Sequence, residues 1–110
     1  MAYRETSAAL QLDLTPPAQP SFRDRPLLLY SRPEGDFSFQ DSQLELLRDD
    51  YGRRLRVEIS SPFAAARRCR AWVSIAQPTF LLLLRNEIVS AAIGQLSTGE
   101  LERMVERALD

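Results

Sequence analysis

The chain has 110 residues, of which 45% are hydrophobic and 26% charged, and its formal net charge is −1 at pH 7. This length leaves room for one small domain. The composition argues against a chain that is disordered throughout. A net charge so close to zero gives no whole-chain signal for binding nucleic acid.

An extended N-terminal arm is predicted over residues 1–26, because closely spaced prolines block helix interiors and sheet ladders. These are Pro16, Pro17, Pro20 and Pro26. Within the arm, Leu10, Leu12 and Leu14 alternate with polar residues, which is the period of a half-buried strand. We expect this strand to add to a neighbouring sheet edge and so to contact a partner. The alternatives are a loose tail and a strand tucked against the chain's own domain.

Residues 27–110 are predicted to form a single α+β domain that begins with an antiparallel β-meander over residues 27–60. Leu27–Tyr30 is a short apolar run that ends in a turn with Pro33 and Gly35. Apolar and polar residues then alternate over residues 37–40 and 44–46, and residues 49–52 suit a hairpin loop. The strict alternation over residues 54–59 is the clearest strand signal in the chain.

Two or three helices are expected to follow the meander. Ser60, Ser61 and Pro62 favour a helix start, because serine is a preferred N-cap and proline suits the first helical position. An apolar stripe follows at helical spacing and consists of Phe63, Ala66, Cys69, Val73 and Ala76. Pro78 should end or bend this helix.

The last third of the chain contains one ambiguous segment and one clear helix. Residues 78–96 fit a buried helix, which their length and composition favour, or a hairpin that turns near Arg85 and Asn86. After them, Ser97 and Glu100 have the spacing of a capping box. An apolar face then runs from Leu101 to Leu109, which predicts an amphipathic terminal helix.

No catalytic apparatus is visible in the sequence, so we expect a protein that is not an enzyme and has no cofactor or metal. There is no histidine, which removes the usual general base and the commonest metal ligand. Cys69 is the only cysteine, so no intramolecular disulfide can form and a cytoplasmic location fits best. The four glycines are too scattered for a phosphate-binding loop. Between Arg70 and Arg85 the uncharged run is too short to insert into a membrane.

Arginine is the one residue type with a functional pattern, because all 14 basic residues are arginines. Charge is also segregated: residues 1–50 carry −4, residues 51–96 carry +5 and residues 97–110 carry −2. Six arginines are concentrated in the middle segment: Arg53, Arg54, Arg56, Arg67, Arg68 and Arg70. Arginine binds carboxylates and phosphates in bidentate fashion, so this group is a candidate contact surface.

The sequence therefore predicts a non-enzymatic interaction subunit: an accessory, assembly or chaperone-like component of a hetero- or homo-oligomeric complex. Its contacts would be the leucines of the arm and an arginine-rich face formed by these six residues. The alternative is a small nucleic-acid-binding protein that uses the arginines of residues 53–70, with Tyr51, Phe63 and Trp72 for stacking.

Overall fold

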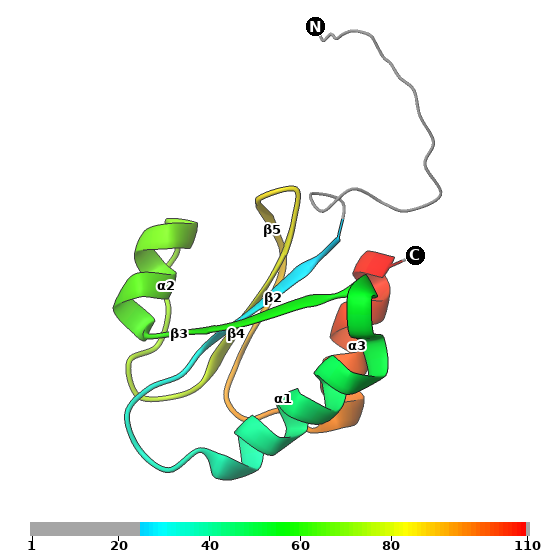
Figure 1. Cartoon of the computed structure of the whole chain (residues 1–110). Coiled ribbons are helices and arrows are strands. Elements are labelled where there is room, and N and C mark those ends of the chain that lie inside the picture. Colours follow the sequence, from blue (N-terminus) through cyan, green and yellow to red (C-terminus); the bar gives the residue numbers. More distant parts are fainter. Residues whose placement is uncertain (1–24, 110) are drawn as a thin grey trace, which may run out of the picture.

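A four-stranded sheet lies at the centre of residues 25–109, the part of the chain that the computed structural model describes. The strands are β2 (Leu27–Ser31), β3 (Arg56–Ser60), β4 (Thr79–Leu84) and β5 (Glu87–Ile93), in the spatial order β3-β2-β4-β5. The helices are α1 (Ser38–Tyr51), α2 (Pro62–Cys69) and α3 (Thr98–Leu109), with a short 3-10 turn η2 (Gly52–Arg54) (Figure 1). The predicted α+β class is confirmed.

The sheet is mixed, because a helix occupies the middle of the region predicted as a meander. β2 pairs parallel with β3 and antiparallel with β4, and α1 makes the crossover that a parallel pair requires. The strand and hairpin loop predicted over residues 44–52 are therefore wrong. In α1 the buried residues are Gln40, Leu44, Leu47 and Tyr51, spaced by four, three and four.

Gln40 hid this helical pattern, since it is polar and yet fully buried. Its side-chain oxygen accepts from the Leu96 amide at 2.7 Å, and its side-chain nitrogen donates to the Leu96 carbonyl at 3.0 Å. Phe39 and Leu46, which suggested strand alternation, are 61% and 54% exposed. The buried amide joins the start of α1 to the segment that leads into α3.

Residues 79–93 form a hairpin. The hairpin alternative is therefore confirmed, and the helix that length and composition favoured is wrong. β4 and β5 pair antiparallel, with an irregularity between Leu82 and Leu83. The turn falls at Arg85 and Asn86, which have φ values of 54° and 69°. Two consecutive positive φ values are typical of a type I′ turn, whose twist matches that of the flanking strands.

The helices α2 and α3, which precede and follow the hairpin along the chain, begin where the sequence predicts. The Ser61 side chain accepts a hydrogen bond from the Ala64 amide at 3.3 Å, and Pro62 opens α2. At α3, the Ser97 amide donates to Glu100 at 2.9 Å and the Glu100 amide donates to Ser97 Oγ at 3.2 Å, which confirms the capping box. However, α2 ends at Cys69, and Phe63, predicted on its buried stripe, is 76% exposed.

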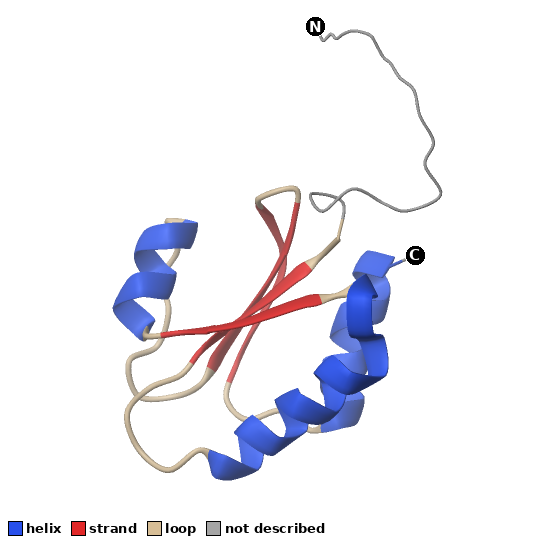
Figure 2. Ribbon diagram, in the orientation of Figure 1, coloured by secondary structure: helices blue, strands red, loops and turns tan. Residues whose placement is uncertain are grey.

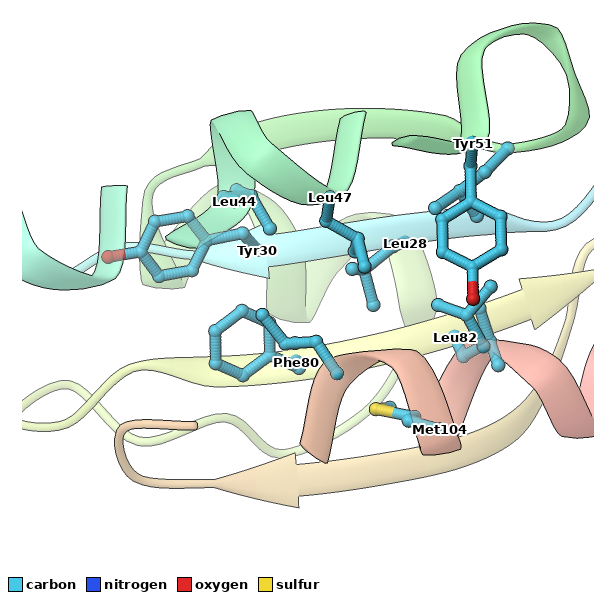
Figure 3. Packing of buried hydrophobic residues seen from close by; sticks show 11 residues of the cluster. Leu28, Tyr30, Leu44, Leu47, Tyr51, Phe80, Leu82 and Met104 are labelled. Carbon is cyan, nitrogen blue, oxygen red and sulfur yellow. The ribbon is translucent and has the colours of Figure 1, made fainter. Parts of the chain in front are cut away.

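The two faces of the sheet are covered unequally. α1 and α3 both pack on one face, which we call the closed face, and α2 is the one described helix on the other (Figure 2). Tyr30 and Phe80 stack on the closed face with ring centroids 5.0 Å apart, beneath α1 and beside Met104 of α3 (Figure 3). The second face has a smaller cluster, built from β2, β4, α2 and Val73.

The predicted arm lies almost entirely outside the described residues, and so do Leu10, Leu12 and Leu14. Within residues 25–109, no helix is long and apolar enough to cross a membrane.

Candidate functional site

The connection between β2 and α1 is held in place by its own charged residues. Asp36 accepts hydrogen bonds from the Ser38 amide at 3.1 Å and from Ser38 Oγ at 2.7 Å, and these bonds lower the pKa of its carboxyl. Arg32 pairs with Asp41 at 3.1 Å, and its guanidinium lies 5.9 Å from the centre of the Phe37 ring. A carboxylate at the start of a helix is stabilised by the helix dipole. The start of α1 thus carries carboxylates and no thiol.

Cys69 lies near the C-terminal end of a helix, in the last turn of α2. Burial raises the pKa of its thiol, and the Arg68 charge only partly opposes this effect. The negative end of the helix dipole also disfavours a thiolate there. Reactive cysteines need the opposite conditions, namely a lowered pKa and an electropositive, accessible setting. The environment of Cys69 therefore suits a packed side chain.

A shallow groove of about 620 Å³ follows the closed-face helices between the end of α1 and α3. Tyr51 donates a hydrogen bond to Glu106 across it, and the Arg54 guanidinium lies 5.0 Å from the centre of the Tyr51 ring. Burial raises the pKa of Tyr51 to about 12, and the bond to Glu106 adds to this effect. The groove mixes acids and arginines, so it has no strong preference for one sign of charge. Its lining contains neither histidine nor cysteine.

Metal binding is not favoured by the described residues. Over residues 25–109, no group of three or more histidine, cysteine, aspartate or glutamate side chains is arranged to hold an ion.

The six candidate arginines are divided between the two sides of the sheet. Arg53 and Arg54 belong to η2, which follows α1 on the closed-face side. The Arg53 carbonyl accepts a hydrogen bond from Arg25 at 2.9 Å. Arg56 lies on β3, while the remaining three lie on α2 and at its end: Arg67, Arg68 and Arg70. Arg68 donates to Glu58 at 2.5 Å, so part of the charge of α2 is neutralised by the neighbouring strand.

Three large apolar side chains are highly exposed on α2 and in the segment that follows it. Phe63 is 76%, Trp72 is 74% and Ile75 is 71% exposed. Phe63 shares one face of α2 with Arg67, because positions four apart fall on the same helix face, and Arg70 follows as the C-cap. We call Phe63, Arg67, Arg70, Trp72 and Ile75 the α2 surface.

The sequence identified the arginines of this surface but not its apolar members as a group. The periodicity places Phe63 on the buried stripe, and Trp72 is predicted only as a stacking residue for nucleic acid. Helical spacing does place Phe63 with Arg67, so the stripe could have been recognised as amphipathic with its aromatic residue outward. Nothing in the sequence marks Trp72 as exposed.

Comparison with known proteins identifies the fold but not a family. No protein-family model and no curated protein matches the sequence. Among solved structures, the chain is similar to a malarial protein, with a TM-score of 0.63 and 19% identity over 78% of this chain and 99% of that one. It is also similar to thioredoxin-2, a component of the malaria parasite protein secretion machinery, with a TM-score of 0.63 and 18% identity over 76% of this chain and 82% of that one. The chain therefore shares the fold of a thioredoxin.

The thioredoxin type of redox motif requires two cysteines, spaced Cys-x-x-Cys. This chain has one cysteine, and the sequence between β2 and α1 reads Arg32-Pro-Glu-Gly-Asp-Phe37. The chain thus has the fold without the dithiol.

Proposed function

We propose that this chain is a non-enzymatic protein-interaction subunit that uses a thioredoxin fold as a scaffold. It acts as an accessory, assembly or chaperone-like component of a larger complex. The observation that carries this proposal is the α2 surface, where large apolar side chains that are about three-quarters exposed accompany two exposed arginines.

Residue type and exposure both support binding at this surface. Contiguous exposed apolar side chains mark interaction sites in soluble proteins. Tryptophan and arginine are also enriched among the few residues that carry most of the binding energy of an interface. The α2 surface combines both residue types on one short helix and the connection that follows it. Arg67 and Arg70 would attract acidic groups of a partner, while Trp72 and Ile75 would be buried against its apolar groups.

The thiol chemistry of the chain supports the same proposal. With one cysteine, whose pKa is raised, the chain cannot close a dithiol within itself. Thioredoxin-2, which shares its fold, is described as a component of a protein secretion machinery, and a role within a multi-protein assembly would be of the same general kind. The predicted contact through Leu10, Leu12 and Leu14 stays a separate prediction.

The test compares variants of the tagged full chain purified gently from its native cells. Trp72→Ala and Arg67→Glu should each reduce the co-purified partner, by about thirtyfold for a residue worth ~2 kcal/mol. Leu46→Ser is the matched control, because Leu46 is 54% exposed but lies on α1 on the other side of the sheet. Equal partner recovery by all three variants would contradict the proposal.

Nucleic acid binding is the second candidate, and it is favoured by the exposed Trp72 close in sequence to Arg67, Arg68 and Arg70. Bases stack on aromatic side chains, and arginines neutralise phosphates. Anisotropy of a labelled mixed oligonucleotide should then fall steeply between about 50 and 200 mM salt. An Arg67→Glu, Arg68→Glu double variant should flatten that dependence. If the partner is a protein, as we propose, the oligonucleotide should not bind even at low salt.

A further inference from the structure

Half of the second sheet face carries apolar side chains that no described element covers. Residues directly opposite each other in an antiparallel pair share a face. Leu83 pairs with Ile88, Leu81 pairs with Ala91 and Thr79 pairs with Ile93. Leu81 and Leu83 belong to the α2-side cluster, so the three β5 residues opposite these positions project on that side. We call Ile88, Ala91 and Ile93 the open face.

The open face is accessible to solvent and lies on the edge strand β5. Ile88 is 39% and Ile93 is 50% exposed, and Ala91 is exposed as well. α2 packs on β2 and β4 through Ala65, and none of the β5 residues joins its cluster. On the opposite side of the sheet, α1 and α3 bury the facing residues of β2 and β4, and Ala92 of β5 packs against their cluster. An exposed apolar sheet half is typical of a surface that another segment or another molecule covers.

We propose that the chain's own N-terminal segment covers the open face, with Leu10, Leu12 and Leu14 packed against Ile88, Ala91 and Ile93 in place of the partner contact that the sequence predicts. The period of two in this segment places its three leucines on one side of an extended chain. They span about 13 Å, while Ile88 to Ile93 spans about 17 Å. An extended segment of this length thus matches the strip that it would cover.

The point at which the chain enters the sheet allows this placement. Leu27 is paired with Leu83, and Leu83 is paired with Ile88. The first residue of β2 therefore lies level with Ile88 of the open face across the sheet. β5 lies two strands from β2, about 10 Å away. The residues between Leu14 and Arg25 reach up to about 35 Å when extended. The segment can therefore return over the sheet without strain, and this assignment does not depend on whether the α2 surface binds a partner.

Paramagnetic relaxation measures the placement directly in the full chain. A nitroxide is attached to Gln11→Cys in a Cys69→Ala background, which leaves all three leucines intact. The amide signals of Ala91 and Ile93 should lose at least half their intensity, while the signal of Leu46 on the closed-face side stays unchanged. Equal intensities at all three positions would overturn the proposal. Loss confined to Val57 and Ile59 would also overturn it, because the segment would then lie at the β3 edge.

Two controls establish which chain and which side chains cover the open face. Tagged unlabelled protein mixed with untagged isotope-labelled protein should give no loss at β5, and a loss there would mean that a second copy is the occupant. A Leu10→Ser, Leu12→Ser, Leu14→Ser variant should abolish the effect and shift the β5 amide signals. The matched Gln11→Ser, Asp13→Ser variant, without a tag, should leave those signals in place. If the triple variant left the β5 signals unshifted, the leucines would not be the covering groups.

Discussion

The two faces of the sheet differ in how they are completed, although the same strands contribute to both. On the closed face, α1 and α3 bury Leu28, Tyr30, Phe80 and Leu82, which are all fully buried. On the other face, the two-turn α2 covers only β2 and β4, and the β5 side chains remain exposed. We therefore expect the closed face to account for most of the stability, whereas the α2 side keeps apolar strand residues exposed.

The largest effect is expected from a charge placed in the closed face. Leu101 of α3 is fully buried there, so Leu101→Asp would bury a carboxylate among apolar groups. The cost of several kcal/mol is comparable to the whole stability of a small domain. Circular dichroism should show an unfolded protein at room temperature. Glu102→Gln, on the neighbouring position of α3, should melt within a few degrees of the wild type, and similar melting of both variants would contradict the closed face as the stabilising core.

Two adjacent residues of β4 allow the two faces to be compared within one strand. Leu82 points to the closed face and Leu81 to the α2 side, and both are buried. Leu82→Ala should lower the free energy of unfolding by about 3–5 kcal/mol. Leu81→Ala should cost only about 2–3 kcal/mol, because the thinner side can relax around the cavity. Urea denaturation measures both values, and a larger loss for Leu81→Ala would reverse the proposed order of the faces.

Alkaline pH should weaken the closed face in particular. Burial raises the pKa values of Tyr30 and Tyr51 from the ordinary 10.0 to about 12. Nearby carboxylates, Asp41 and Glu106, add to this effect. Because the folded-state pKa values are raised, the stability that they contribute is fully present below pH 10 and is lost as the pH rises through 12.

The urea midpoint should therefore fall between pH 10 and 12, together with the rise of tyrosinate absorbance. Tyr51→Phe should make this fall smaller, because one of the two buried phenols no longer ionises. At neutral pH the same variant should lose only about 1 kcal/mol, the net value of its hydrogen bond to Glu106. A fall in midpoint that is equally steep in Tyr51→Phe would contradict the role of this phenol.

The smallest expected effect on stability comes from a substitution at Arg70, which should change stability and partner binding in opposite directions. Arg70 ends α2 with a φ of 51°, a conformation that glycine adopts without strain. Arg70→Gly should therefore raise the free energy of unfolding by up to about 1 kcal/mol. The same change removes a charge from the α2 surface and should weaken partner recovery. A variant that is more stable and still binds fully would remove Arg70 from the contact surface.

Local signals in the sequence predicted those elements that local chemistry determines. The strand at Leu27, the strand ending at Ser60, the start of α2 and the capping box of α3 all depend on alternation or on capping residues next to each other. α1 was missed because a buried glutamine replaced an apolar residue, and its partner, Leu96, is 56 positions away along the chain. β4 could not be distinguished from a helix, because a strand buried on both faces is apolar throughout.

The candidate site was predictable only in part for a related reason. The density of arginines between residues 53 and 70 is a property of the sequence, but their division between two sides of the sheet is a property of the topology. Exposure of Trp72 depends on where α2 ends, since Arg70 turns the chain out of the helix before the predicted stripe is complete. A periodic pattern cannot reveal such an early end.

The central claim is that this chain uses a thioredoxin fold for binding and not for thiol chemistry. The most direct test is the rate at which the full chain reduces insulin disulfides with dithiothreitol as the electron donor. Wild type and Cys69→Ser are compared at equal concentration with the reaction that lacks protein. We predict that neither protein raises the rate above this background, because one poorly ionised thiol cannot complete dithiol exchange. A catalysed rate that is present in the wild type and lost in Cys69→Ser would contradict the account.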